Sequence, residues 1–385
     1  MPAPLRILTI IGARPQIIKA AAISRAIANH PKGQVVETLL HTGQHYDANM
    51  SQVFFEELGI PAADINLNVG SGNHGAMTAR MIEGIEQVLL KKEHDVVVLY
   101  GDTNSTLAGA LAAAKLNVPI AHVEAGLRSF NKRMPEELNR IACDHMSTWL
   151  FCPTETAVLN LEREGFRRSI GARPSIDHPL IDLSGDVMFD NSTWFAGISD
   201  RRSGLLSELR LPSGGFVLAT VHRELNTDDP VRLNAIFRSL LALHQQHELP
   251  VVLPVHPRTL KCMESLLDTE VLKTLRSNPS FHLLPPAGFL DMIALEKHAR
   301  LVVTDSGGVQ KEAFFFDRPC IVLRAETEWV ELVQQGQAVL VNADEKLFAE
   351  AAQLILEKDA RSYPRIFGDG HAAERIIGRL VSDLG

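Results

Sequence analysis

Acidic side chains follow two of the apolar runs in the first half of the chain, at the point where each run ends. Asp102 comes soon after Val96–Tyr100, Glu124 comes directly after Val118–Val123, and Glu136 lies in the segment that follows. Like charges that share a site push some carboxyl pKa values up toward the working pH, so acid and base can be neighbours. The residue types therefore indicate proton transfer. Asp102 could equally be a helix N-cap, and Glu136 a first-turn helix carboxylate.

A pair of glycines opens a predicted helix in the second half, after the apolar run Leu301–Thr304. The segment Ser306–Gly308 lets the backbone come close to a ligand, while the unpaired N–H groups of a helix start face an anion. A diphosphate is the expected ligand. The alternative is a helix that begins with glycines and binds no ligand. Glu312 lies about one turn further on and could reach ribose hydroxyls, and Arg324 at the end of the next run is another candidate phosphate contact.

Histidine and arginine recur at the ends of other predicted strands. His222 and Arg223 follow one run of the second half, and His256 and Arg258 follow the next. Arg14 stands in the turn after the first run of the chain, where it is aimed at the crevice beyond the strands. A capped turn with a solvated arginine is the alternative for Arg14.

Two further motifs resemble cofactor sites only weakly. The polar loop His41–Asp47 suggests ligand contact, but no third ligand accompanies His41 and His45 at a spacing that suits a metal, and a solvated loop is also possible. Gly70–Gly75 matches the GxGxxG pattern, yet the preceding Asp64–Val69 is a weak strand and the motif does not open the first βαβ unit. A glycine-rich loop beside the crevice is the preferred interpretation.

The elements that must position these residues are short apolar strands alternating with helices. Continuous apolar strands separated by helix-length segments are typical of parallel sheets that are covered on both faces. We therefore predict an α/β protein with two Rossmann-like, doubly wound parallel sheets, and ligands bound beyond the carboxyl ends of the strands. The predicted strands are Leu5–Ile11, Val35–Leu40, Val96–Tyr100, Val118–Val123 and Thr148–Phe151 in the first half, and Phe216–Val221, Val251–Val255, Phe281–Leu284, Leu301–Thr304, Cys320–Leu323 and Ala338–Val341 in the second.

The chain has 385 residues, which exceeds the length at which one hydrophobic core usually stops growing. Arg167–Arg202 contains prolines and glycines and no sustained periodicity, so we place the domain boundary near Gly185. The expected domains are residues 1–184, with the candidate catalytic carboxylates, and residues 185–369, with the anion site. Residues 370–385 form a predicted helix that could cross back to the first domain.

The composition excludes several classes of protein. A net charge of −8 and a pI near 6.0 argue against nucleic-acid binding, and no apolar run is long enough to span a membrane. The start of the chain shows no targeting segment, so we expect a soluble protein of the cytoplasm. The cysteines form no CxxC pair, and we predict that they are small buried hydrophobes; they are Cys143, Cys152, Cys262 and Cys320.

Taken together, the motifs resemble the non-hydrolysing UDP-N-acetylglucosamine 2-epimerases over nearly the whole chain. The resemblance implies a two-domain fold like that of the GT-B glycosyltransferases, usually dimeric, with UDP in the interdomain cleft and no metal or nicotinamide. The motifs that carry it are Gly12-Ala13-Arg14-Pro15, His41–Asp47, Gly101-Asp102-Thr103, His122–Arg128, Pro135-Glu136-Glu137 with Asn139-Arg140, His222-Arg223 and Asp305–Gly308.

The resemblance also implies roles for individual residues. Those that match catalytic positions are Asp102, Glu124, Glu136 and His222, and those that match substrate-binding positions are Arg14, Lys19, Arg140, Ser306, Gly307, Gly308, Glu312 and Arg324. Those that match a region where the family can bind a second, activating UDP-sugar are Gln44, His45 and His256.

The reaction implied is interconversion of UDP-N-acetylglucosamine and UDP-N-acetylmannosamine by anti elimination of UDP to 2-acetamidoglucal and re-addition. Any of the three carboxylates could be the base. The basic segment Arg128–Met134 departs from the commonest pattern, and Lys132 or Arg133 could meet the carboxylate of UDP-2,3-diacetamido-2,3-dideoxyglucuronate, the substrate of a related subgroup. A solvated loop is the alternative for this segment. A GT-B glycosyltransferase, a hydrolysing epimerase and a nucleotide-sugar sensor are the rival functions.

Overall fold

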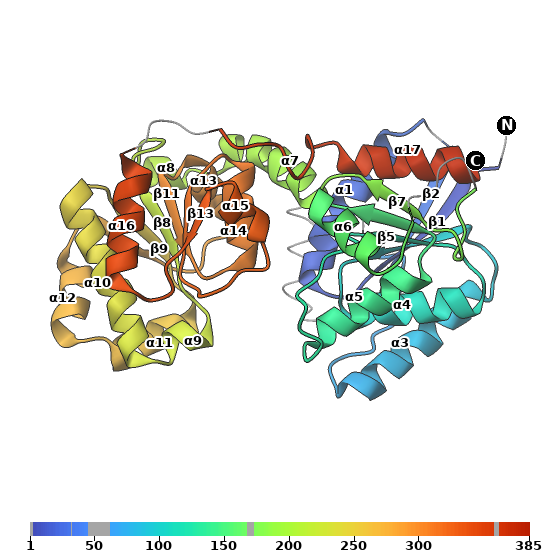
Figure 1. Ribbon diagram of the computed structural model, residues 1–385, viewed down its shortest axis with the longest axis horizontal. Helices are drawn as coiled ribbons and strands as arrows, with labels where there is room; N and C mark the ends of the chain where they lie inside the picture. The colour runs from blue at the N-terminus through green and yellow to red at the C-terminus, as the bar shows by residue number, and fades with distance from the viewer. Residues whose placement is uncertain (1–2, 32, 45–61, 168–172, 358–361) are drawn as a thin grey trace. The chain divides into compact units, whose positions relative to one another are not determined.

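Two compact units make up the chain (Figure 1). The first comprises Met1–Asn191 and Arg365–Gly385, and the second comprises Ser192–Pro364. The computed structural model describes residues 3–31, 33–44, 62–167, 173–357 and 362–385. Each unit contains one sheet of parallel strands with helices in the connections, which confirms the predicted fold class.

The sheet of the first unit has seven strands in the order β3-β2-β1-β4-β5-β6-β7. All pairings are parallel, and every residue of β4 is buried, as expected for a sheet covered on both faces. The strands are β1 (Leu5–Ile11), β2 (Val35–His41), β3 (Ile65–Asn66), β4 (Val96–Tyr100), β5 (Ile120–Val123), β6 (Trp149–Cys152) and β7 (Leu180–Leu183). The helices are α1 (Arg14–Asn29), α3 (His74–Leu89), α4 (Asn104–Lys115), α5 (Pro135–Met146), α6 (Glu155–Arg163), α7 (Val187–Arg202), which begins in this unit, and α17 (Ala372–Leu384).

The sheet of the second unit has six parallel strands in the order β10-β9-β8-β11-β12-β13. The strands are β8 (Val217–Thr220), β9 (Val251–Pro254), β10 (Phe281–Leu284), β11 (Leu301–Thr304), β12 (Cys320–Val322) and β13 (Ala338–Leu340). The helices are α8 (Leu205–Glu208), α9 (Glu224–Thr227), α10 (Pro230–His247), α11 (Pro257–Leu266), α12 (Thr269–Ser277), α13 (Phe289–His298), α14 (Gly307–Phe315), α15 (Val330–Gln334) and α16 (Glu345–Leu356).

The strand order reverses direction once in each sheet, between β1 and β4 in the first unit and between β8 and β11 in the second. Ligands of open parallel sheets bind outside the carboxyl ends of the strands at such a point, because the connecting helices leave on opposite faces there and a crevice opens between the two loops. The loops that begin at Gly12, Gly101, Val221 and Asp305 follow these four strands. These loops contain many of the residues singled out in the sequence.

The helix at the end of the chain lies with the first unit, where α17 packs against α1. The Asp190 carboxylate accepts hydrogen bonds from the backbone N–H groups of Ala372 and Ala373, at 3.1 and 2.7 Å. The indole of Trp149 donates to Asp383 at 2.8 Å. The division between the compact units falls inside α7 and again before Arg365, whereas the sequence suggested boundaries near Gly185 and after residue 369.

Each strand predicted from the sequence corresponds to an observed strand, but β7 and α7 were missed. Both lie in the segment that we interpreted as an irregular linker. The strand β7 is only four residues long and carries Asp182 within it, so it has neither a sustained apolar run nor a clean alternation. Its residues pair with β6 along its full length.

The cysteines are free thiols. Cys143, Cys152 and Cys320 are buried, as predicted. The prediction was wrong for Cys262, which is partly exposed on α11 with its sulfur 3.8 Å from a carboxylate oxygen of Asp228.

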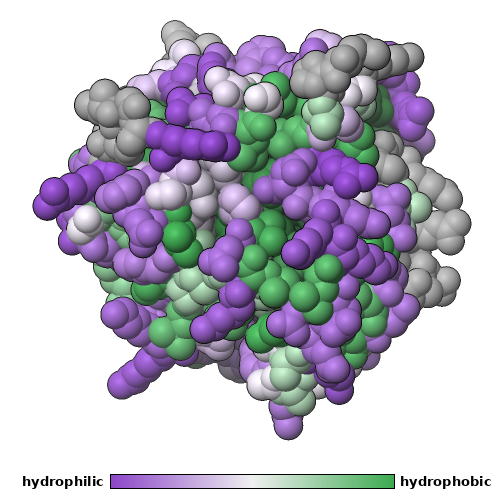
Figure 2. Space-filling view, turned by 90° about the vertical axis from the view of Figure 1, so that its right-hand side faces the viewer, coloured by the Kyte–Doolittle hydropathy of each residue, from purple (hydrophilic) through white to green (hydrophobic). Residues whose placement is uncertain are grey.

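On the face shown in Figure 2, hydrophobic side chains gather into a patch near the centre and hydrophilic side chains surround it. Large exposed apolar residues of the first unit include Phe130, Met134 and Leu138, in and just after the loop between β5 and α5. Within the described residues, no helix is both long enough and apolar enough to cross a membrane.

Candidate active site

The turn after β4 brings the backbone against a charged pair. Gly101 has a φ of +60°, a conformation that favours glycine, and its N–H donates to the carbonyl of Val123 at 3.0 Å. A Cβ atom at this position would lie 3.1 Å from Nζ of Lys19 and 3.3 Å from Oε2 of Glu124. Glycine is required here by the backbone conformation and by the closeness of the pair.

Lys19 of α1 forms an ion pair with Glu124, the residue that follows β5. The two side chains are only 14% and 11% exposed, so they interact largely out of water. Glu124 has a φ of +71°, which is uncommon for a residue with a side chain. Strain of this kind persists only where the surroundings impose it, and it clusters at functional sites.

Asp102 lies next to Gly101 and pairs with Arg140 of α5. Arg140 also donates to the buried carboxylate of Glu137 at 2.6 Å. Glu137 in turn accepts from the backbone N–H groups of Ser129 and Phe130, each at 2.9 Å. Glu137 therefore fixes both the arginine and the start of the basic loop, a role that the sequence alone did not suggest.

Gln16 joins the turns that follow β1 and β4. Its side-chain carbonyl accepts from the N–H groups of Gly12 and Ala13, at 2.9 and 3.1 Å. Its amide nitrogen donates to the carbonyl of Tyr100 and the hydroxyl of Thr106, both at 3.0 Å. The sequence indicated only that this residue lies in a helix start; its buried position between two neighbouring strands explains why an amide with both donor and acceptor is needed.

Other predicted residues of the first unit lie at the same sheet edge. Arg14 begins α1 and Glu136 stands in the first turn of α5, and both are exposed. Gln44 accepts hydrogen bonds from the N–H and hydroxyl of Ser105, at 3.2 and 2.8 Å. His45 lies outside the described residues.

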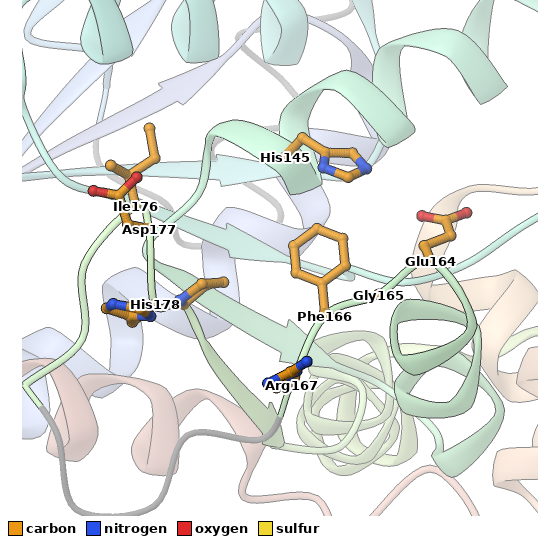
Figure 3. A pocket seen from close by; sticks show the side chains of 9 residues that line it. His145, Glu164, Gly165, Phe166, Arg167, Ile176, Asp177 and His178 are labelled. Carbon is orange, nitrogen blue, oxygen red and sulfur yellow. The ribbon is translucent and has the colours of Figure 1, made fainter.

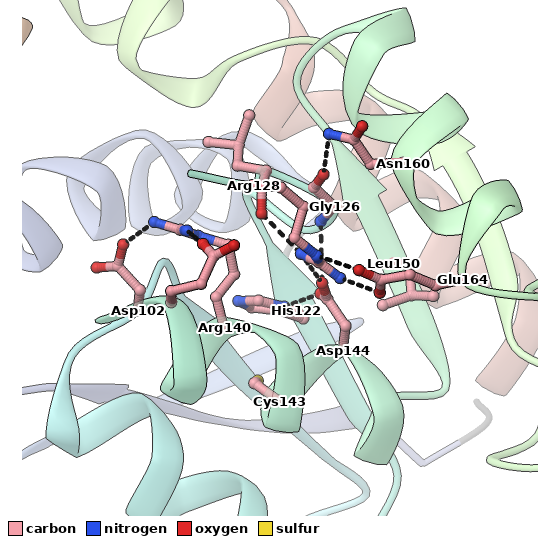
Figure 4. A network of polar contacts seen from close by, with 12 residues as sticks. Asp102, His122, Gly126, Arg128, Arg140, Cys143, Asp144, Leu150, Asn160 and Glu164 are labelled. Carbon is pink, nitrogen blue, oxygen red and sulfur yellow. Dashed lines mark hydrogen bonds and ion pairs between the residues drawn. The ribbon is translucent and has the colours of Figure 1, made fainter. Parts of the chain in front are cut away.

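A buried polar network lies behind the Gly101 turn (Figure 4). The ring of His122 contacts Asp144 through Nδ1 at 2.7 Å and the carbonyl of Gly101 through Nε2 at 2.8 Å. Asp144 also pairs with Arg128 at 2.7 Å, and Arg128 holds both oxygens of Glu164 at 2.7 and 2.6 Å.

The network also sets the ionisation of its buried members. Burial alone would lower the pKa of His122, but Cys143 and Asp144 outweigh burial and hold that pKa well above its usual value. Burial alone would raise the pKa of Asp144, but His122 and Arg128 keep it below its usual value.

In the second unit, a buried aspartate orients the histidine that follows β8. Nδ1 of His222 lies 3.0 Å from Oδ1 of Asp305, and the backbone N–H groups of His222 and Arg223 donate to the same carboxylate, the latter at 3.0 Å. Asn226 donates to it as well, at 3.0 Å. Burial would raise the pKa of Asp305, but these hydrogen bonds keep the pKa below its usual value. The His222 side chain is about half exposed.

The start of α14 combines a capping serine with two glycines of different surroundings. The Ser306 hydroxyl accepts from the N–H of Val309 at 3.5 Å. A Cβ at Gly307 would lie 1.9 Å from Oε1 of Glu328, whereas one at Gly308 would meet only the Ser306 hydroxyl, at 3.8 Å. A side chain at Gly308 would therefore meet no close neighbour among the described residues, while Gly307 makes room for Glu328.

Arg324, the predicted phosphate contact, pairs with that same Glu328 at 2.7 Å. On α14, Glu312 is partly buried and its charge raises the pKa of Glu296 on α13, a group that burial already shifts well upward. His256 caps α11, where its Nδ1 accepts from the N–H of Arg258 at 3.3 Å, and its side chain faces solvent.

A pocket of about 480 Å³ lies elsewhere in the first unit (Figure 3). Its walls come from the ends of α5 and α6 and from the segment before β7, and the rings of His145 and Phe166 meet there with centroids 4.7 Å apart. None of the predicted site residues lines it, although Glu164 belongs both to its wall and to the His122 network. In the part of the chain that the structure describes, no group of histidine, cysteine and carboxylate side chains is arranged to hold a metal ion.

Two parallel sheets, each with charged and polar residues at its switch point, define an α/β enzyme of the two-domain, GT-B-like class. Residues 25–381 match the UDP-N-acetylglucosamine 2-epimerase family, and the chain belongs to that family. Its relatives are named as UDP-sugar 2-epimerases, which are isomerases.

The relatives match along nearly their full length. The UDP-2,3-diacetamido-2,3-dideoxy-D-glucuronate 2-epimerase of Pseudomonas aeruginosa is 50% identical over 378 residues, which covers 98% of this chain and 99% of the relative. The solved structure of the UDP-GlcNAc 2-epimerase from Methanocaldococcus jannaschii aligns with a TM-score of 0.85 and 38% identity, covering 98% of this chain and all of that one. A structure of the same archaeal enzyme in complex with UDP-GlcNAc and UDP aligns with a TM-score of 0.79, 39% identity and the same coverage.

Proposed function

We propose that the protein inverts C2 of a UDP-linked 2-acetamido sugar by eliminating UDP and adding it back. Membership of the epimerase family supports the reaction class. The observation that carries the proposal for the site is the pairing of Asp102 with Arg140 and of Glu124 with Lys19 around one turn. A base for C2 has to accept a proton, and carboxylate side chains are groups of that kind.

The chemistry explains why several acid–base groups are needed. The C2 proton of such a sugar has no neighbouring carbonyl carbon, so it cannot leave by enolate formation. A carboxylate takes the proton, the electron pair of the C2–H bond forms the C1–C2 double bond, and the C1–O bond breaks to release UDP. A proton is then delivered to the opposite face of C2 while UDP adds at C1. In this proposal the proton-transfer groups are Asp102, Glu124, Glu136 and His222.

The departing diphosphate needs groups that stabilise negative charge. The start of α14 offers N–H groups at Gly307 and Gly308, next to Ser306, whose own N–H donates to the Thr304 hydroxyl at 2.9 Å, and a helix of nine residues adds its positive end. Arg324 would exchange its Glu328 partner for a phosphate oxygen, and Glu312 would hold the ribose. In the first unit, Arg14, Lys19 and Arg140 would hold the sugar and the phosphates.

We propose UDP-2,3-diacetamido-2,3-dideoxy-D-glucuronate as the substrate. The support is the 50% identity with the Pseudomonas aeruginosa enzyme named for that sugar. Lys132 and Arg133 are exposed in the loop before α5 and are available to a uronate carboxylate. UDP-GlcNAc is the second candidate, supported by the archaeal structure in complex with that sugar.

Isotope exchange tests the reaction and the substrate together. The protein is incubated with each UDP-sugar in D2O, and C2 is followed by NMR. Deuterium at C2 and appearance of the C2 epimer, faster with the glucuronate than with UDP-GlcNAc, are expected. Faster exchange with UDP-GlcNAc would transfer the assignment to that sugar, and no exchange with either would overturn the epimerase proposal.

The basic loop gives a specificity test. Replacing Lys132 and Arg133 together by alanine should raise KM for the glucuronate by about tenfold and leave KM for UDP-GlcNAc nearly unchanged, because only the former has a carboxylate to pair with. Steady-state kinetics with both sugars measure the difference. An equal rise in both KM values would show that the two cations act on the shared part of the substrate, and an unchanged KM for the glucuronate would show that they are merely solvated.

Three further assignments complete the proposal. We propose a homodimer, supported by the exposed apolar residues Phe130, Met134 and Leu138, and light scattering measures the mass.

A second UDP-sugar is proposed to activate the enzyme through Gln44, His45 and His256. This predicts sigmoidal kinetics, and Gln44→Ala should make the kinetics less sigmoidal. The free cysteines support a reducing compartment such as the cytoplasm, where the product would enter cell-surface polysaccharide biosynthesis.

A further inference from the structure

We propose that His122 is a positioning residue for the epimerisation: a buried imidazolium, held by Asp144, that fixes the Gly101 carbonyl and with it the turn that carries Asp102 past Lys19 and Glu124. The catalytic part of this inference rests on the proposed function. The protonation of both ring nitrogens of His122 is inferred from their hydrogen-bond partners and does not depend on the proposed function.

The hydrogen-bond partners of the ring determine where its protons are. Nε2 lies 2.8 Å from the Gly101 carbonyl, which can only accept, so Nε2 carries a hydrogen. Nδ1 lies 2.7 Å from Oδ1 of Asp144, so one hydrogen lies between these two atoms. Whether the ring is charged depends on whether that hydrogen belongs to the histidine or to the carboxyl group.

The surroundings of Asp144 favour its ionised form. Its second oxygen lies 2.7 Å from a guanidinium nitrogen of Arg128 and accepts from the N–H of Gly126 at 3.2 Å. A carboxylate with three donors is strongly stabilised as the anion, so the shared hydrogen belongs to His122. With Glu164 on the far side of Arg128, the network holds two positive and two negative groups and its net charge is zero.

The groups that face the ring come from several elements. Asp144 and Cys143 lie on α5, Arg128 follows β5, and Glu164 follows α6. On the side of the turn, the charges nearest to Gly101 are those of Lys19 and Glu124. His122 and Asp144 are fully buried, so water does not compete for these contacts.

The contact with Gly101 has a direct consequence for the active site. The N–H of Gly101 is held by Val123 and its carbonyl by His122, so both of its backbone groups are fastened to β5. Glycine has more backbone freedom than any other residue, and a turn that lost the second bond could reorient its next peptide unit. That unit leads into Asp102. A charged donor makes a stronger hydrogen bond than a neutral one and so holds the turn more firmly.

Nitrogen NMR of the ¹⁵N-histidine-labelled protein tests the protonation directly. Both ring nitrogens of His122 should remain protonated from pH 6 to pH 9, and the resonance is assigned by its loss in His122→Gln. A ring with one unprotonated nitrogen at neutral pH would overturn the imidazolium. This measurement needs no substrate, so it stays informative even if neither UDP-sugar shows exchange at C2 and the proposed function fails.

Kinetics test the positioning role. Asp144→Asn removes the charge that holds the imidazolium, and His122→Gln replaces the ring with a neutral amide. Both should lower kcat for C2 exchange by at least about tenfold and leave KM within about threefold, because the turn acts on the reacting groups and not on UDP.

Trp149→Phe is the matched control. It removes another buried hydrogen bond of the first unit, at the start of β6, away from the Gly101 turn. A control that loses kcat equally, or an Asp144→Asn variant with unchanged kcat, would reduce His122 to a structural residue and overturn the proposal. If His122→Gln does not fold, the kinetics of Asp144→Asn still decide.

Discussion

Glu124 has features expected of a catalytic carboxylate: a strained backbone, a cation beside it and little exposure to water. Replacing it by glutamine keeps the shape of the side chain and removes the charge. Glu124→Gln should therefore lower the rate of C2 deuterium exchange by about 10²–10⁴-fold, the usual contribution of a general base. UDP affinity, measured by calorimetry, should stay within about threefold.

The exposed Glu83 provides the control, since Glu83→Gln removes the same charge from α3, a helix that contains none of the proposed site residues. Its exchange rate should equal that of the wild type. Turnover by Glu124→Gln at the wild-type rate would remove this residue from the catalytic group and leave Asp102 and Glu136 as the candidates.

The buried carboxyl group of Glu296 should make the free energy of unfolding depend on pH. Burial and the charge of Glu312 raise its pKa well above the usual value, and one of its oxygens has no hydrogen-bond partner among the described residues. A carboxyl group with a raised folded-state pKa binds more protons in the folded state than in the unfolded state, so stability falls as pH rises from the unfolded pKa through the folded one. Glu296→Gln should remove this decline and stabilise the protein at pH 8 by about 1 kcal/mol or more, because the ionised group no longer has to be buried.

Urea unfolding at pH 5 and pH 8 measures the effect. The free energy of unfolding of wild type should decrease relative to the variant between these two values. Glu350→Gln, at an exposed position of α16, should follow the wild type. Identical pH dependence of wild type and Glu296→Gln would show that Glu296 is not the group responsible.

At the scale of the residue, the sequence singled out candidate site residues by their type and position but could not predict how they pair. Strand-end position was enough to single out Asp102, Glu124, His222 and the start of α14. It could not show that Arg324 pairs with Glu328, since that contact depends on how the chain returns after β12. Gln16 was missed as a network member because its amide donates to Tyr100, far along the chain. Glu137 was missed because its contact with the N–H of Ser129 depends on how the loop before α5 folds back.

At the scale of the element, the turn after β4 has to combine a left-handed backbone with a close approach of Lys19 and Glu124. Gly101→Ala should lower the free energy of unfolding by about 1–2 kcal/mol through backbone strain, and in addition lower kcat at least tenfold by pushing on the ion pair. Thermal unfolding and C2 exchange measure the two effects.

Gly33 is the matched comparison, because it has a φ of +82° and nothing within 4 Å of a Cβ placed there. Gly33→Ala should suffer the same kind of backbone strain and keep its activity. If both variants lost activity in proportion to stability, the closeness of the ion pair to Gly101 would have no catalytic consequence.

The regular elements followed from the sequence wherever the apolar pattern was strong. Runs such as Val96–Tyr100 and Leu301–Thr304 were predicted with their observed bounds, because strands buried on both faces need continuous apolar residues. The strand β7 lies at the edge of its sheet and has one buried residue among four, so its formation depends on pairing with β6 and not on its own composition. The helix α7 was missed because polar residues interrupt its apolar stripe.

At the scale of the whole molecule, the chain passes from the first unit to the second and returns, since α17 belongs with the unit in which the chain began. A helix pattern in the last residues was visible in the sequence, with Ile376, Ile377 and Leu380 on one face. Which unit that face covers could not be derived from the pattern, because the amphipathic helix would fit an apolar surface of either. The contacts with α1, Asp190 and Trp149 give its place in the structure.

Removal of residues 372–385 should therefore act on one unit only. The deletion uncovers the surface on which three almost fully buried aliphatic side chains rest, and each such side chain contributes about 1.5–3 kcal/mol when buried. Hydrogen exchange followed by mass spectrometry should show lost protection in β1, α1 and β6, with β8–β13 protected as in the full chain. The milder Arg379→Ala, which removes a contact with Asp383 on the same helix and a charge near Asp182, should keep protection in both sheets. Loss of protection in β8–β13 as well would mean that the two units unfold as one cooperative body.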